Sequence, residues 1–141
     1  MTFNFRPAFT LPALALTTAA LLGGCATMSS TPEQVVKLRA AQQWKARVAN
    51  NFDSTYTFTP PSYRALTSLE AYKKGFGPAV AIKSAEVADV KCETEDKCTT
   101  QVKVEAQPLL PLARRKVPPI TTYIDETWIR EDGQWWLFPT P

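Results

Sequence analysis

The spacing of apolar residues changes near residue 79, and this change limits the folds open to the chain. Before it, Val36, Ala40, Trp44 and Val48 recur every four residues, which predicts one amphipathic helix. After it, apolar and polar residues alternate, as they do in half-buried strands. Helices followed by hairpin-linked strands predict an α+β domain, with the N-terminal helices packed on one face of an antiparallel sheet.

Helix caps predict where the helices begin. Thr31-Pro32-Glu33-Gln34 combines a threonine cap, a proline suited to the first turn and a glutamine that completes a capping box. Asp53 is the candidate cap of a short second segment, which Pro60-Pro61 ends. Thr67-Ser68-Leu69-Glu70 forms a second capping box, and Gly75 marks the end of a third helix. Three helices are therefore expected.

At least four strands are expected in the second half of the chain. "AVAIKSAEVADVKC" alternates with a slip near Ser84-Ala85 that indicates a bulge. "CTTQVKVEA" alternates cleanly, so its even-numbered residues from Thr100 to Ala106 share one face. "ITTYIDETWI" and "QWWLF" flank Asp132-Gly133, a dipeptide typical of tight hairpins.

Two cysteines bracket the link between the first two strands. A hairpin places Cys92 and Cys98 opposite each other, within disulfide reach. A zinc site is the first alternative, but it needs two further ligands and the chain has no histidine. A redox-active pair is the second, but a C-x-x-C motif at a helix start is absent. A structural disulfide is the prediction.

The N-terminal segment is typical of an export signal. Residues 8–22 are mainly apolar, and they are too short for a membrane span, which needs about 20 residues. Leu22-Gly23-Gly24-Cys25 resembles the lipobox of bacterial lipoproteins. An ordinary secretory signal, with an incidental cysteine, is the alternative.

The lipobox resemblance implies that Cys25 is lipidated and becomes the first residue of the mature chain. The full sequence then divides into three parts. Residues 1–24 are then a signal peptide, residues 25–30 a lipidated tether and residues 31–141 a single domain. Ala26 after the cysteine implies the outer membrane, with the lipid-anchored domain facing the periplasm.

Composition narrows the chemistry that is expected. The absence of histidine excludes histidine-based acid–base catalysis and histidine-ligated metal sites. The formal net charge of +3 is too small to indicate nucleic-acid binding. Neither a cofactor nor a metal site is predicted.

Longer stretches resemble a known superfamily. "AAQQWKARVANNFDSTYTFTPPSYRALTSLEAYKKGFG", "KSAEVADVKCE" and "DETWIREDGQWWLF" are similar to the nuclear-transport-factor-2-like superfamily, also called SnoaL-like or cystatin-like. Within it, small uncharacterised bacterial lipoproteins are the nearest likeness. The resemblance implies a strongly curved antiparallel sheet that wraps the long helix into a cone with an apolar pocket.

Five aromatic residues are the candidate lining of such a pocket: Trp44, Tyr56, Tyr123, Trp128 and Trp135. The alternative is that they fill the core. Trp135 and Trp136 are strand neighbours and face opposite sides, so one of them must be exposed or lie under another element.

The expected function is a non-enzymatic binding or accessory module for a small apolar ligand or an envelope protein. The alternative is a pocket enzyme of the isomerase or dehydratase type with an aspartate base, which the resemblance suggests. Asp53, Asp89 and Asp125 are the candidate bases, with Tyr56 or Tyr123 as proton donor. Asp125 and its neighbour Glu126 point to opposite faces, so one of the pair is expected to be buried and partnered.

Overall fold

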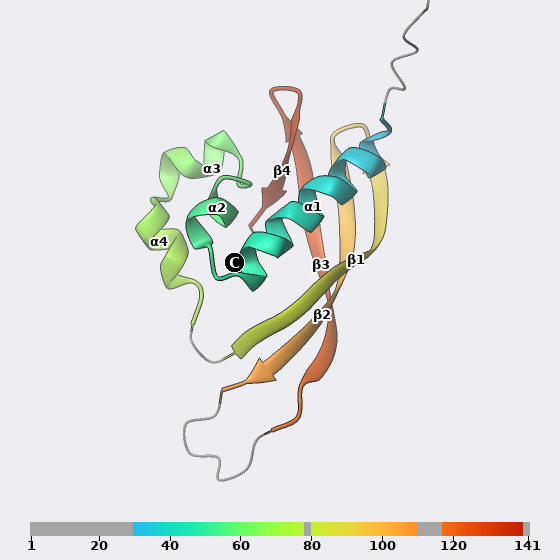
Figure 1. The fold of residues 1–141 in the computed structure, drawn as a ribbon. Coiled ribbons are helices and arrows are strands. Elements are labelled where there is room, and N and C mark those ends of the chain that lie inside the picture. The colour runs from blue at the N-terminus through green and yellow to red at the C-terminus, as the bar shows by residue number, and fades with distance from the viewer. Residues whose placement is uncertain (1–29, 78–79, 110–116, 140–141) are drawn as a thin grey trace, which may run out of the picture.

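A computed structural model describes residues 30–77, 80–109 and 117–139. Four helices precede four strands (Figure 1): α1 Pro32–Val48, α2 Phe52–Tyr56, α3 Pro61–Leu66, α4 Leu69–Lys74, β1 Val80–Thr94, β2 Lys97–Pro108, β3 Ile120–Glu131 and β4 Gln134–Phe138. The strands form one antiparallel sheet in the order β1-β2-β3-β4. The predicted α+β class is confirmed at this level. None of the described helices combines the length and apolar character needed to cross a membrane.

Helix α1 begins at the predicted capping box. The Thr31 side chain accepts a hydrogen bond from the Gln34 backbone N–H at 3.3 Å, and the Gln34 side chain accepts one from the Thr31 N–H at 3.1 Å. The predicted stripe is buried at Val36, Ala40 and Trp44. It lies across one face of the sheet, where α1 crosses the strands (Figure 1).

The short helices differ from the prediction in number and in their caps. Pro61 starts α3, a helix that the prediction lacked, because a proline that ends one helix also fits the first turn of the next. The cap of α2 is Asn51 and not Asp53, and the cap of α4 is Ser68 and not Thr67. In α2 and α4, two neighbouring polar residues could each serve as the cap, so the sequence alone does not decide between them.

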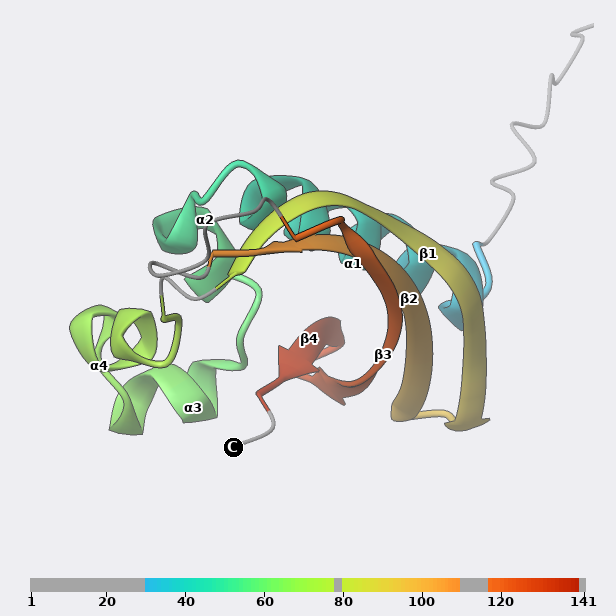
Figure 2. The ribbon, with the colours of Figure 1, turned by 90° about the horizontal axis from the view of Figure 1, so that it is seen from below.

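One face of the sheet forms the core. Strand β2 alternates as predicted, with its even-numbered residues from Cys98 to Ala106 buried against α1. Trp128 on β3 and Trp135 and Leu137 on β4 complete the buried cluster. The long strands bend along their length (Figure 2), and the β1–β2 register shifts between Ile82 and Ser84, close to the predicted bulge.

Strand β4 forms the edge of the sheet opposite β1, and the loop after α2 covers part of that edge. Asp132 and Gly133 form the predicted hairpin turn, both with positive φ, 52° and 74°. The Leu137 N–H donates to the Phe58 carbonyl at 2.8 Å, so the outer edge of β4 is partly paired. The guanidinium groups of Arg39 and Arg64 lie over the Trp136 ring. Trp135 is therefore the tryptophan in the core, and Trp136 is the one that lies under other elements.

Cys92 and Cys98 are opposite each other in the β1–β2 register and are joined by a disulfide, with 3.8 Å between their Cα atoms. The predicted proximity of the two cysteines is therefore confirmed. Cys98 is fully buried against Trp128, its register partner on β3, while Cys92 is half-buried near the edge. The bridge ties the edge strand to the centre of the sheet.

Reduction of this disulfide is expected to lower the free energy of unfolding by about 2 kcal/mol or less, because the bond closes a short loop. Urea unfolding with and without reductant measures the difference. A Cys92→Ala/Cys98→Ala variant is the control, since reductant should leave its unfolding unchanged. A loss of about 5 kcal/mol, the upper end for native disulfides, would contradict the prediction.

Candidate functional site

A cavity of about 520 Å³ lies beside the C-terminal end of α1, between the short helices and the last two strands. It is large enough for a small organic molecule. Its walls combine apolar side chains with a few polar ones: Arg47, Tyr63, Ala71, Tyr72, Gly75, Phe76, Ile124, Asp125, Glu126, Leu137, Phe138 and Pro139.

Glu126 is the buried acid of this cavity, with 7% of its surface exposed. The Trp44 indole N–H donates to its Oε2 at 2.9 Å, and the Thr100 hydroxyl donates to the same oxygen at 3.5 Å. The partners come from α1 and β2, so the carboxyl is held where the helix, the sheet and the cavity meet. The expectation that one residue of the Asp125–Glu126 pair is buried and partnered is met by Glu126.

Burial raises the pKa of Glu126 above its ordinary value of 4.5, and this is the largest influence on the group. The hydrogen bond from Trp44, the positive charge of Arg47 and the hydrogen bond from Thr100 each lower its pKa in part. The net direction is upward, so the protonated form is favoured relative to an exposed glutamate. A protonated carboxyl can donate a hydrogen bond into the cavity.

Arg47 is the cation of the cavity wall. Its guanidinium carbon lies 4.8 Å from the Trp44 ring centroid and 4.9 Å from that of Phe76. It lies on the last turn of α1, where a positive charge also interacts favourably with the helix dipole. Stacking against two rings orients the guanidinium, so its position does not depend on a carboxylate partner.

Aromatic side chains from α3, α4 and the segment after α4 line the helical side of the cavity: Tyr63, Tyr72 and Phe76. Tyr72 is buried at the centre of this group, packs against Tyr56, Tyr63 and Phe76, and donates a hydrogen bond to the Thr55 hydroxyl at 3.2 Å. Burial raises the pKa of Tyr72, so it stays a neutral phenol.

The five predicted pocket residues do not line this cavity. Trp44, Trp128 and Trp135 are buried in the core between α1 and the sheet. Tyr56 donates a hydrogen bond to the Thr67 carbonyl at 2.6 Å, and Tyr123 is 57% exposed on the opposite face of the sheet. The reason is strand alternation, which sends Tyr123 away from the helices, and core packing, which takes the large indoles.

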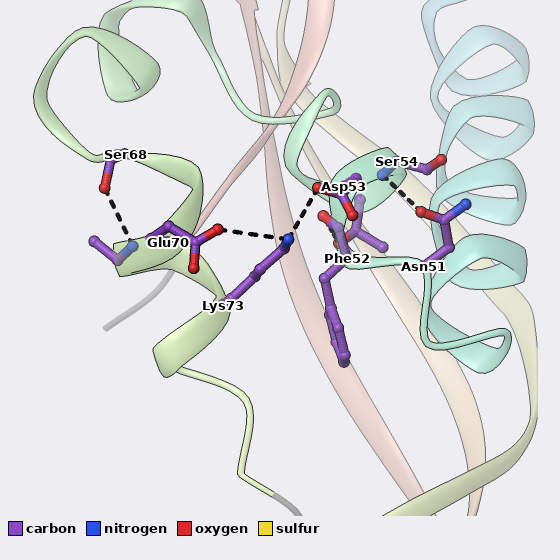
Figure 3. A network of polar contacts seen from close by, with 9 residues as sticks. Asn51, Phe52, Asp53, Ser54, Ser68, Glu70 and Lys73 are labelled. Carbon is purple, nitrogen blue, oxygen red and sulfur yellow. Dashed lines mark hydrogen bonds and ion pairs between the residues drawn. The ribbon is translucent and has the colours of Figure 1, made fainter.

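The three candidate aspartates are spread over the molecule. Asp53 is exposed on α2 and pairs with Lys73 at 3.0 Å, and Lys73 also contacts Glu70 at 3.7 Å (Figure 3). Asp89 is exposed on the edge strand β1. Asp125 borders the cavity but is exposed, and its Oδ1 accepts a hydrogen bond from Gln101 at 3.3 Å. None of the three is a buried base.

Arg47 and Glu126 were not among the predicted pocket residues. Glu126 had one readable signal, its place next to Asp125 on a strand whose alternation must bury one of them. Arg47 had none, because a basic residue on the last turn of a helix is usually solvated. Cys25, the predicted lipidation site, lies outside the described residues. Within the described ranges, groups of three or more metal-binding side chains are absent.

No protein-family model matches this chain, and a search of curated proteins finds no match. Solved structures do resemble its fold. A SEC-C motif containing protein from Rhodopseudomonas palustris aligns with a TM-score of 0.52 and 13% identity over 70% of this chain and 71% of that chain. A SEC-C motif containing protein from Psychrobacter arcticus aligns with a TM-score of 0.56 and 11% identity over 90% of this chain and 75% of that chain.

These likenesses show the fold alone, and they correct the predicted family. The assignment to nuclear-transport-factor-2-like, SnoaL-like lipoproteins is wrong, since the two solved structures described above, which resemble this fold, are SEC-C motif containing proteins. The stretches behind that assignment encode a capped helix, a helical tryptophan and an Asp-Gly hairpin. Such local elements recur in many α+β proteins and do not determine how the helices lie on the sheet.

Glu126→Gln is expected to change how stability depends on pH. Because the folded-state pKa of Glu126 is raised, the unfolded chain ionises first, and wild-type stability falls relative to the variant as pH rises above 4.5. The slope is at most about 1.4 kcal/mol per pH unit, and the difference becomes constant above the raised pKa. Well below 4.5 both states are protonated and the difference is also constant.

Urea unfolding of both proteins between pH 4 and pH 8 measures this effect. The lower end lies about half a pH unit below the ordinary glutamate pKa, and the upper end lies well above it. Glu105→Gln, which removes an exposed carboxylate from the opposite face of the sheet, is the control. Parallel stability curves for wild type and Glu126→Gln would contradict the raised pKa.

Proposed function

We propose that this protein is a non-enzymatic binding module that holds a small, mainly apolar ligand in the cavity beside α1. The observation that carries the proposal is the cavity itself: about 520 Å³, walled by Phe76, Ile124 and Leu137, with a buried acid and an oriented cation. Apolar walls with a few placed polar groups are typical of small-molecule sites. The predicted cone shape belongs to the same proposal, as the bent sheet would then form the wall behind the ligand.

A lipid anchor on Cys25 is the second part of the proposal. The lipobox-like Leu22-Gly23-Gly24-Cys25 supports it, and Ala26 supports the outer membrane, with the domain on the periplasmic side. In this arrangement the protein would hold its ligand close to the membrane surface. The predicted envelope-protein partner stays a prediction.

A pocket enzyme is the second candidate, and the buried carboxyl of Glu126 is what favours it. A buried carboxyl with a raised pKa is a candidate general acid or base, and Glu126 lines the cavity. Its Oε2 already accepts from Trp44 and Thr100, which suits a positioned group in either role. Conversion of a bound ligand by wild type and not by Glu126→Gln would favour the enzyme.

Filling the cavity tests the binding proposal. Ala71→Trp places a large side chain at the cavity wall and is expected to weaken binding of the neutral fluorescent probe N-phenylnaphthylamine by at least about tenfold. Ala65→Trp is the matched control, because Ala65 is an exposed alanine on a neighbouring short helix, α3, and does not line the cavity. Equal probe binding by the two variants would place the probe elsewhere and reject the proposal.

Cys25→Ser tests the anchor. Because the thiol is the acceptor of the diacylglycerol group in lipoproteins, the variant is expected to lose incorporation of labelled palmitate and to leave the membrane fraction. Ser29→Ala, a change in the neighbouring tether, should keep both properties. A Cys25→Ser protein that still fractionates with the outer membrane would show that the anchor lies elsewhere.

A further inference from the structure

Arg47 is the positively charged residue of the cavity wall, and its charge lies close enough to Glu126 to lower the pKa of that carboxyl. None of the ion pairs among the described residues involves Arg47, and its side chain has no hydrogen bond to a described acceptor. Its flat faces are covered by Trp44 and Phe76, so the N–H groups at its edge are what remains for a partner. A planar acceptor in the guanidinium plane would complete this site.

Glu126 faces the same cavity and is satisfied on one side only by the described residues. Both of its hydrogen bonds reach Oε2. The charged and titratable groups around the cavity are Arg47 from α1, Tyr63 from α3, Tyr72 from α4 and Asp125, the neighbour of Glu126 on β3. A cationic ligand would meet the positive charge of Arg47, whereas a neutral ligand would leave that charge without a partner.

We propose that the ligand of this cavity is a small carboxylic acid with an apolar body. Its carboxylate lies beside Arg47 and Glu126, and its body packs against Phe76, Ile124 and Leu137. The inference rests on the proposed binding function and adds the charge and shape of the ligand.

The balance of charge favours a single negative charge. Arg47 is the cation that lines the cavity, and it can neutralise one carboxylate. A doubly charged phosphate monoester would leave its second charge against the buried Glu126. Glu126 in its protonated form donates to the ligand carboxylate, and its raised pKa makes this form accessible. Binding therefore takes up a proton wherever Glu126 is ionised in the free protein.

A series of three probes of matched shape tests the inference. Phenylacetate, phenylacetamide and phenethylamine present a negative, a neutral and a positive end on the same ring. Calorimetric titration of the protein, purified from cells that express the full chain, should give phenylacetate at least about tenfold tighter binding than the amide. Phenethylamine should bind most weakly. The affinity for phenylacetate should rise as pH falls, and Glu126→Gln should flatten this dependence.

Arg47→Gln should reduce the preference for phenylacetate over the amide to about unity. Arg39→Gln is the matched control, because Arg39 is on the same helix and stacks on Phe58 and Trp136 at 5.3 and 5.2 Å, away from the cavity. It should keep the full preference. Circular dichroism and thermal unfolding check both variants, and the probe series on wild type does not depend on either variant folding.

The results separate two failures. If N-phenylnaphthylamine binds in the cavity but phenylacetate is not preferred over its amide, the ligand class is wrong and the binding function stands. If Arg47→Gln and Arg39→Gln behave alike, Arg47 does not recognise the anion and the inference is overturned. If none of the probes binds, both the proposed function and the inference fail.

Discussion

The hydrogen bond from Trp44 to Glu126 joins the two halves of this fold. It connects the helix that crosses the sheet with the strand that carries the cavity acid, over 82 positions of sequence. A buried carboxyl without partners would cost several kcal/mol, on the order of the stability of a small domain. The indole N–H and the Thr100 hydroxyl offset that cost. The same contact therefore positions α1 and sets the chemistry of the cavity.

The cavity exists because an aromatic cluster lies between the short helices and the sheet and keeps them apart. Tyr72 and Phe76 contact each other and the rings around them, and these large rigid side chains leave space beside Ile124 and Leu137. The Asp53–Lys73 pair bridges α2 and α4 at the surface (Figure 3), where solvent screens it and its contribution to stability is small. Packing of rings, more than surface charge, determines the shape of the site.

Local patterns predicted the elements well and their assembly poorly. Short-range rules predicted four features that agree with the structure: the capping box at Thr31, the alternation of β2, the Asp132-Gly133 turn and the Cys92–Cys98 pair. The family resemblance failed because it read the same local features as evidence for a tertiary arrangement. Gln43 on α1 shows that short-range rules do not fully predict which helix residues are buried. It is fully buried although it is polar, and its amide atoms have no hydrogen-bond partner among the described residues.

The sequence by itself determined the periods, the turns and the pairing of cysteines, because each depends on residues close together in the chain or across one hairpin. It also required that either Asp125 or Glu126 be buried, since strand alternation sends neighbours to opposite faces. Only the tertiary structure decided that Glu126 is the buried one, that Arg47 lies in the same cavity and that the tryptophans fill the core instead of a pocket. Those choices depend on which side chains from α1, α4 and β3 meet in space, and helix spacing and strand alternation carry no information about that meeting.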